Sequence, residues 1–194
     1  MKKLVIFGVV LVVFLMGFWG VGLVNRCIRL NENTDFQWSE IANQYQRRSD
    51  LIPNLVEVVK GYAAHEKNTL NEVVEARSKA TQIQVDVNDS QSVKQFLAAQ
   101  GELSGALGRL IAISENYPAL KANENFLALQ SQLEGTENRI AVARQDYNNA
   151  VRQFNNHIRV IPNRWIIPLF TDFEPREMLS IDEATAKVPS VSFQ

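Results

Sequence analysis

The sequence predicts an all-α protein in which an N-terminal transmembrane helix is followed by an elongated antiparallel bundle of about four long helices. Two observations lead to this fold class. An uninterrupted apolar run lies close to the N-terminus, and most of the remaining sequence repeats apolar residues at three- and four-residue steps. Of the 194 residues, those after the apolar run are enough for one domain with a single core.

The apolar run predicts a membrane anchor over residues 1–29. Every residue from Leu4 to Val24 is apolar or glycine, and roughly 20 helical residues cross the hydrocarbon core of a bilayer. A cleaved signal peptide has an apolar stretch of only about 7 to 15 residues and a small-residue cleavage site, and this sequence fits neither feature. A lipoprotein acceptor at Cys27 would follow a small residue, whereas Arg26 precedes it. A helix apolar on all sides would also find too little protein in a small domain to cover it.

Charge indicates the orientation and excludes one class of partner. Lys2, Lys3 and the terminal amine precede the run, and Arg26 and Arg29 follow it, which favours a cytoplasmic N-terminus and an extracytoplasmic bundle. Four of the 20 basic residues lie before residue 30, so 16 face 21 acidic ones afterwards, a net formal charge of about −5. This balance argues against nucleic-acid binding.

The bundle is expected over residues 30–160. Residues 30–48 continue the anchor helix, and Ser49 or Asp50 caps a second helix that has Pro53 in its first turn and runs from Leu51 to Thr81. A third helix begins at Asp89 or Ser90 and ends around Asn116, and a fourth extends from Asn123 to Arg159. The second and fourth helices would be about 46 and 55 Å long.

The fourth helix carries a coiled-coil-like seam with a seven-residue spacing. The apolar positions of the seam are Phe126, Leu133, Ile140, Tyr147 and Phe154, and polar Gln130, Glu137 and Arg144 interrupt the interleaved positions. The third helix adds a strip of small residues at Gly101, Ser104, Gly105 and Gly108. We expect this strip to allow the close approach of a neighbouring helix.

Polar residues at two places form a candidate interhelical network: Arg47, Arg48, Asp50, Asn54, Glu137, Asn138, Arg144 and Asn148. The first interpretation is that they fix the register of the bundle through hydrogen bonds, as polar core residues of coiled coils do. The second is that they line a binding site.

Residues 161–194 are expected to comprise an apolar segment rich in proline and tryptophan and a loosely ordered acidic tail beyond Thr171. Because the fourth helix returns toward the membrane, the apolar segment could contact the membrane surface or simply close the end of the bundle. The candidate contact residues are Trp165, Ile166, Ile167, Leu169 and Phe170.

The sequence offers no recognisable catalytic constellation, and we assign no catalytic, cofactor-binding or metal-binding residues. His65 and Glu66 are adjacent, but a zinc-protease motif needs a second histidine at position 69, which is Thr. The glycines around Gly105 lack the preceding strand and the following Lys-Ser or Lys-Thr of a phosphate-binding loop.

Three long motifs resemble the LemA family of membrane-anchored helical proteins. They are RRSDLIPNLVEVVKGYAAHE from Arg47 to Glu66, EARSKA from Glu75 to Ala80, and YPALKANENFLALQSQLEGTENRIAVARQDYN from Tyr117 to Asn148. The resemblance covers roughly residues 30–170. It implies a membrane helix followed by a bundle that projects from the membrane surface, without a known reaction, and gene neighbourhoods in the family imply envelope maintenance and proximity to a membrane protease.

The expected function is therefore that of a non-enzymatic scaffold or adaptor at the cell envelope. Its expected partners are the lipid bilayer, other envelope proteins including a membrane protease system, and further copies of itself. A sensor or small-ligand receptor with a cavity between the helices is the alternative. A hydrolase with an unfamiliar site around His65, Glu66 and Glu137 ranks last.

Overall fold

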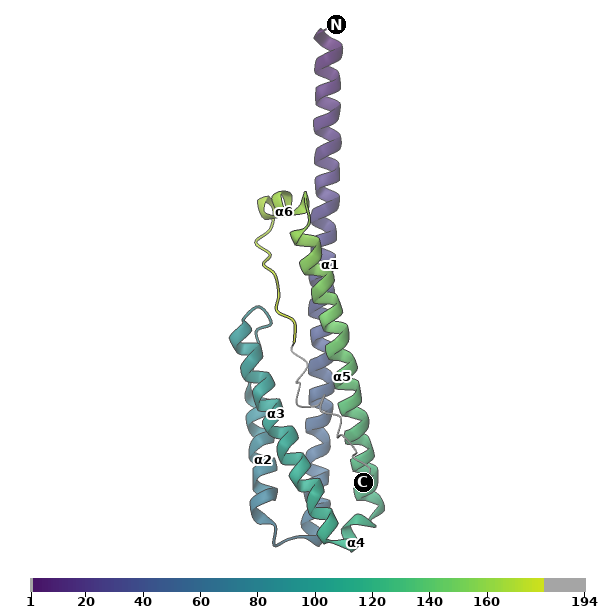
Figure 1. Cartoon of the computed structure of the whole chain (residues 1–194), viewed down its shortest axis with the longest axis vertical. Coiled ribbons are helices and arrows are strands. Elements are labelled where there is room, and N and C mark those ends of the chain that lie inside the picture. The colour runs from purple at the N-terminus through teal and green to yellow at the C-terminus, as the bar shows by residue number, and fades with distance from the viewer. Residues whose placement is uncertain (1, 180–194) are drawn as a thin grey trace, which may run out of the picture.

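The computed structural model describes residues 2–179, without the side chains of residues 2, 4, 5, 9, 12, 13 and 16. It consists of helices and confirms the elongated all-α bundle (Figure 1). The elements are α1 (Lys2–Tyr62), α2 (Lys67–Gln82), α3 (Ser90–Ile113), η1 (Ser114–Asn116), α4 (Pro118–Lys121), α5 (Glu124–Arg159), α6 (Asn163–Ile166) and η2 (Ile167–Leu169).

The first helix is longer than the sequence suggested, because α1 does not end before Pro53. It contains 61 residues, a length of roughly 90 Å. Proline lacks an amide hydrogen, so Pro53 leaves the carbonyl oxygen of Ser49 without its helical partner. Arg77 of α2 supplies the replacement, since its Nε donates to the Ser49 oxygen over 2.8 Å. The predicted helix start at Ser49 or Asp50 is therefore wrong.

The chain reverses ten residues later, at 63–66. The Ala63 amide still bonds to the carbonyl of Val59, and the Leu70 amide bonds to that of Glu66, so one helix ends and the next begins within a short turn. The apolar stripe of α1 does not indicate a helix end at Pro53, because buried side chains continue at helical spacing from Tyr45 through Ile52 to Val59. Packing thus holds α1 together where local capping signals favoured a break.

The predicted starts of the third helix at Asp89 or Ser90 and of the fourth at Asn123 are confirmed. Asp89 accepts a hydrogen bond from the Gln91 amide at the start of α3, and Asn123 accepts one from the Phe126 amide at the start of α5. The five apolar positions of the seam, which recur every seven residues from Phe126 to Phe154, are all buried. Pro118 begins the short α4 between the two long helices.

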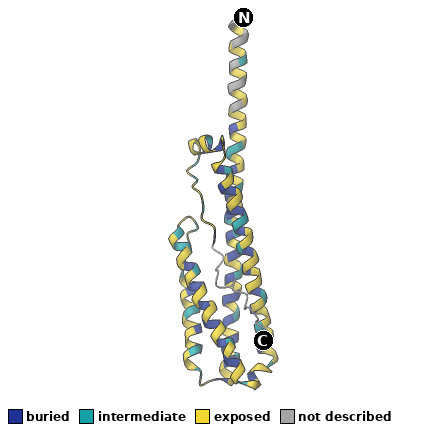
Figure 2. Ribbon diagram, viewed as in Figure 1, coloured by how far each residue is buried: buried dark blue, intermediate teal, exposed yellow. Residues whose placement is uncertain are grey.

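The bundle has two halves of different width (Figures 1 and 2). In the half farther from the N-terminus of α1, here called the wide half, α2 and α3 form a hairpin beside α1 and α5. One large apolar cluster fills the space among these four helices. Toward the N-terminal end of the bundle only α1 and α5 continue, antiparallel to each other. There the apolar core shrinks to Cys27, Phe154, Ile158 and Ile167.

An extended segment at 171–179, here called the strap, covers the narrow half. Asn155 of α5 binds both backbone groups of Arg176: its Nδ2 donates to the Arg176 carbonyl over 2.8 Å, and its Oδ1 accepts from the Arg176 amide over 2.9 Å. Asn148, seven residues earlier, binds the carbonyl and amide of Leu179 in the same way, at 2.9 and 2.7 Å. Residues 171–179 are thus docked rather than loose as expected, while the remainder of the predicted acidic tail, 180–194, lies outside the described residues.

The Arg176 side chain also ties the strap to α1. Its Nη1 donates to Asp35 Oδ1 over 2.6 Å and its Nη2 donates to Asn31 Oδ1 over 2.9 Å. The guanidinium lies over the Phe154 ring, 5.9 Å from the ring centroid. One side chain therefore joins the strap, α1 and α5.

The first third of α1 extends past every other element (Figure 1). Large apolar side chains are exposed along it, among them Phe7 (69%), Phe14 (70%) and Phe18 (77%). Over the part of the chain that the structure describes, no helix combines the length and the mean hydropathy of a membrane span.

Candidate functional site

A groove of about 1300 Å³ lies between α3 and α5. Its floor is formed by Tyr45 and Arg48 of α1. One wall is formed by α3 from Leu97 to Ile111 and the other by α5 from Leu133 to Arg152, and Met178 of the strap lies at its edge. The groove exists because α3 packs on α2 and α5 packs on α1, which leaves the space between α3 and α5 open in the wide half.

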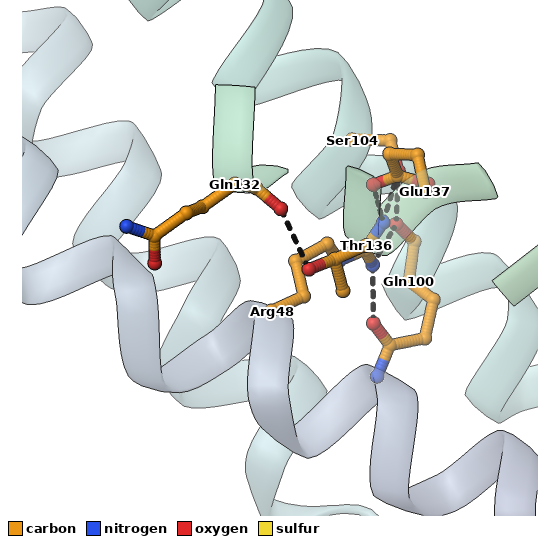
Figure 3. Close-up of polar contacts among 6 residues, drawn as sticks. All are labelled: Arg48, Gln100, Ser104, Gln132, Thr136 and Glu137. Atoms are coloured by element: carbon orange, nitrogen blue, oxygen red, sulfur yellow. Dashed lines mark hydrogen bonds and ion pairs between the residues drawn. The ribbon is translucent and has the colours of Figure 1, made fainter. Parts of the chain in front are cut away.

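Arg48 is the central polar residue of the groove (Figure 3). The residue is 1% exposed. Its Nη1 forms an ion pair with Glu137 Oε1 at 2.5 Å and donates to Ser104 Oγ over 2.7 Å. Its Nη2 donates to the side-chain oxygen of Gln100 over 2.5 Å and to the Gln100 carbonyl over 3.2 Å. A single guanidinium therefore links α1 to both walls.

Tyr45 lies one helical turn before Arg48 and shares the same environment. Its ring meets the Phe96 ring edge to face at 5.2 Å between centroids, and the Arg48 guanidinium lies 5.1 Å from the Tyr45 centroid. Burial raises the pKa of Tyr45 above its usual value, although the charges of Arg144 and Arg48 act in the opposite direction. The phenol is therefore neutral at physiological pH and serves as a packing and hydrogen-bonding group.

The structure brings together part of the predicted polar network. Arg48 and Glu137 pair directly, and Arg144 lies against Tyr45, to which it is hydrogen-bonded. Asn148 instead holds the strap. Asp50 accepts a hydrogen bond from Gln46 on the surface, at 2.7 Å. The remaining predicted members, Arg47, Asn54 and Asn138, are exposed.

Sequence reasoning missed the partners that complete the site. Gln100 is a buried polar residue within the apolar stripe of α3, and this interruption was the available signal. Asn155 and Arg176, which form the clamp on the strap, were also missed. The spacing of seven residues between Asn148 and Asn155 matches the seam and could have indicated that both face the same direction.

The small-residue strip of α3 was expected to face a closely packed helix, but it faces the groove and solvent instead. Gly101, Ser104, Gly105 and Gly108 are all exposed, and a Cβ added at Gly101 or Gly108 would meet nothing within 4 Å. Within the described chain no helix packs tightly against the strip, and Gly101, Ser104 and Gly108 line the groove instead. The expected close helix approach inside the bundle is therefore wrong.

The residues considered for catalysis are dispersed. His65 is exposed in the turn after α1, and Glu66 accepts a hydrogen bond from the Tyr117 hydroxyl over 3.2 Å. His157 lies at the opposite end, where its Nε2 is 3.1 Å from the carbonyl oxygen of Leu23. Among the described residues, no three His, Cys, Asp or Glu side chains converge in a way that could hold a metal ion.

The candidate membrane-contact residues lie together at the end of the bundle from which α1 emerges (Figure 1). Trp165 is 64% exposed, Leu169 76% and Phe170 67%. Ile167 is buried in the narrow core, and Ile166 is partly buried. The segment therefore closes the bundle with one side and presents apolar side chains with the other.

Similarity to known proteins places the chain among LemA-like proteins. It is 27% identical over 157 residues to magnetosome protein MamQ 2 of Paramagnetospirillum magneticum, which covers 71% of this chain and 58% of that relative. It is 25% identical over 150 residues to magnetosome protein MamQ of Magnetospirillum gryphiswaldense, covering 68% of this chain and 55% of that protein. Protein LemA of Metamycoplasma hominis is 26% identical over 149 residues, with coverage of 77% and 65%.

The chain thus spans less than two thirds of the length of each of these relatives. The model of the LemA family matches residues 37–193, which includes the groove, the strap and the end of the bundle. The resemblance inferred from the three motifs is confirmed, and this chain belongs to the LemA family.

Proposed function

We propose that this chain is a non-enzymatic, single-pass membrane protein that serves as a scaffold or adaptor at the cell envelope. The observation that carries the proposal is the composition of α1, a single helix whose first third is apolar and exposed and whose remainder forms the spine of the bundle. The membrane segment and the bundle are then one rigid unit. Such a unit can hold a binding surface at a fixed height and orientation above a bilayer.

The run from Leu4 to Val24 supports the anchor. Its 21 consecutive apolar or glycine residues would extend about 31 Å as a helix, close to the thickness of the hydrocarbon core. The lysines at the N-terminus favour a cytoplasmic start and an extracytoplasmic bundle.

The groove supports the scaffold role. Pockets for small molecules have volumes of about 300 to 1000 Å³ and enclose most of their ligand, whereas this groove has about 1300 Å³ and lies open along two helices. Its walls combine apolar residues such as Leu107 and Ile140 with charged Glu134 and Arg152. This combination of apolar and charged residues suits the binding of a protein segment. The segment would come from another envelope protein, such as a component of a membrane protease system, or from a second copy of this chain.

The anchor is tested by Leu11→Lys combined with Phe14→Lys. Each charge near the centre of a bilayer span costs roughly 2.5 to 3.5 kcal/mol on insertion scales. We expect the unmodified chain to stay with membranes through an alkaline carbonate wash and the double variant to be released with its helical circular dichroism intact. Release of the unmodified chain by the same wash would disprove the anchor.

The scaffold role is tested by a photo-crosslinking residue at Ala141, which lines the groove, and by a matched control at Val142, which is exposed but outside the groove lining. Crosslinking is performed in intact cells. We expect discrete adducts from Ala141 only, and an adduct of twice the chain mass would identify a homo-oligomer. Equal labelling from both positions, or no adduct from Ala141, would contradict the proposal.

One observation favours the alternative role of a small-ligand sensor. Arg48 is buried at the floor of the groove, and its Nε has no hydrogen-bond partner among the described residues. This Nε is enclosed, so a ligand with an acceptor group could use the donor only after neighbouring side chains move. If the chain is a sensor, Glu137→Gln should impair ligand binding or signalling and leave the free energy of unfolding nearly unchanged. If the chain is a scaffold in which Arg48 is structural, the same change should lower the free energy of unfolding and leave binding nearly unchanged.

A further inference from the structure

The short α6–η2 segment carries an unusually dense exposed apolar surface. Within ten residues, Ile161 (67% exposed), Trp165 (64%), Leu169 (76%) and Phe170 (67%) present large apolar side chains to the outside. We refer to these four residues as the platform. Single exposed apolar residues are common on soluble surfaces, but contiguous groups mark an interaction surface.

Direct contacts fix the height of the platform along α1. Ile166 Cγ2 lies 3.9 Å from the position that a Cβ atom on Gly20 would occupy. His157, at the end of α5, approaches the carbonyl oxygen of Leu23 to 3.1 Å. Asn163 of α6 in turn donates to the His157 carbonyl over 2.8 Å. The platform is therefore held level with Gly20 and cannot slide along α1 without breaking these contacts.

This height coincides with one end of the apolar run. Gly20 lies four residues before Val24, the last residue of the run, which corresponds to about 6 Å along the helix. Interfacial helices bury their apolar face about 5 to 10 Å into the boundary between headgroups and acyl chains. A bilayer that surrounds the run from Leu4 to Val24 would therefore meet the platform at this boundary.

Basic residues predominate around the platform, although Asp172 follows Phe170 by two residues. The sequence has no acidic residue from 1 to 31 and none from 147 to 171, whereas Arg26, Arg29, Arg159 and Arg164 lie in these ranges. All four arginines are exposed. Guanidinium groups beside an apolar surface are attracted to the anionic headgroups of a bilayer.

We propose that the platform is a membrane-surface contact, inserted among the headgroups and upper acyl chains of the leaflet that faces the bundle, with the four arginines at anionic headgroups. The inference rests on the proposed anchor and deepens it, because it adds a second contact with the same leaflet. Two contacts set the tilt of α1, so the bundle is held at one angle rather than pivoting on a single helix. Trp165 suits this depth because its indole has an apolar body and one hydrogen-bond donor.

The experiment uses the full chain in vesicles of phosphatidylcholine and phosphatidylglycerol with bromine atoms on the upper acyl chain as quenchers. The Trp19→Phe variant keeps Trp165 and Trp38, and Trp38 is 9% exposed within the bundle, so it serves as an unquenched internal reference. We expect Trp19→Phe to lose most of the Trp165 emission. Adding Trp165→Phe should abolish this loss.

The matched control is Trp165→Phe alone, which retains Trp19 in the anchor. Quenching of Trp19 without quenching of Trp165 would overturn the platform and leave the anchor standing. Quenching of neither residue would overturn both. The unchanged emission maximum of Trp38 in every variant verifies that the bundle is folded.

Discussion

The wide and narrow halves of the bundle are held together by different means. In the wide half, α1, α2, α3 and α5 enclose a cluster of 17 buried apolar residues that extends from Ile52 to Leu133. In the narrow half the apolar cluster among the described residues comprises Cys27, Phe154, Ile158 and Ile167. The strap is attached there by hydrogen bonds with Asn148, Asn155 and Asp35 and by Leu179, which is buried in a further apolar cluster with Trp38 and Tyr147. Where the number of packed helices falls, directed polar contacts supplement apolar burial.

This difference follows from geometry. A pair of helices has one contact line, so most of each helix surface stays in water, whereas four helices share an interior. The amide side chains of α5 compensate by offering the extended strap the two hydrogen bonds that a neighbouring β-strand would offer. The comparison predicts global effects from core changes in the wide half and local effects from changes at the strap.

The largest effect is expected from Leu110→Ala in the wide half. Leu110 is 0% exposed, and truncating a buried leucine costs about 2 to 5 kcal/mol of unfolding free energy. Denaturant unfolding should show this loss. The control Leu127→Ala, at a leucine that is 48% exposed, should change stability by less than about 1 kcal/mol, and equal losses would remove the distinction.

The next effect concerns the ion pair in the groove. Glu137→Gln leaves the buried Arg48 charge with neutral partners, and because Glu137 is 47% exposed we expect a moderate loss of about 1 to 3 kcal/mol. Arg48→Met leaves a carboxylate that water can reach, so it should cost less. Thermal unfolding of both variants checks this order, which a larger loss for Arg48→Met would reverse.

A local effect is expected from Asn155→Ala in the narrow half. The change removes both hydrogen bonds to the Arg176 backbone, worth roughly 1 to 3 kcal/mol for attachment of the strap. Hydrogen exchange should accelerate at residues 171–179 and stay unchanged in α2 and α3. The exposed neighbour Asn156→Ala is the control, and equal acceleration in α3 would show that the halves are not independent.

The smallest effect is a dependence on pH where the strap meets α3. The hydrogen bond from Ser90, together with that from Lys94, lowers the pKa of Glu177 below its usual value of 4.5. The contact therefore contributes fully above pH 4.5 and is lost as the pH falls through the lower, folded-state pKa. The protection of strap amides relative to their intrinsic exchange rate at each pH should fall in acid, and Glu177→Gln should remove this fall. An acid-induced loss of protection that persists in Glu177→Gln would assign the effect to another group.

The sequence predicted those parts of the fold that depend on local signals. The helices that follow Asp89 and Asn123 begin where expected, because a cap is encoded within four residues. The same logic failed at Pro53, where Arg77 from another helix satisfies the carbonyl that proline leaves free. Local capping rules do not include partners that are distant in the sequence.

The candidate site was predicted only in part for the same reason. Arg48 and Glu137, which pair directly, both belong to the predicted set of interhelical polar residues, but the sequence did not specify which members of the set pair. The open groove did not follow, because it depends on α3 packing against α2 rather than α5, and periodicity does not specify which helices are neighbours. The strap has no periodic pattern, and only its partners on α5 reveal where it binds.

The central claim is that α1 is one unbroken helix through Pro53 and links both halves to the apolar run. Double electron–electron resonance between spin labels at Glu32→Cys and Glu57→Cys, in a Cys27→Ala background, tests it most directly. The two positions are 25 residues apart in the sequence, so a continuous helix predicts a narrow distribution centred near 38 Å between the backbones. A broad distribution, or one centred well below about 30 Å as a helix reversal at Pro53 would produce, would contradict the claim.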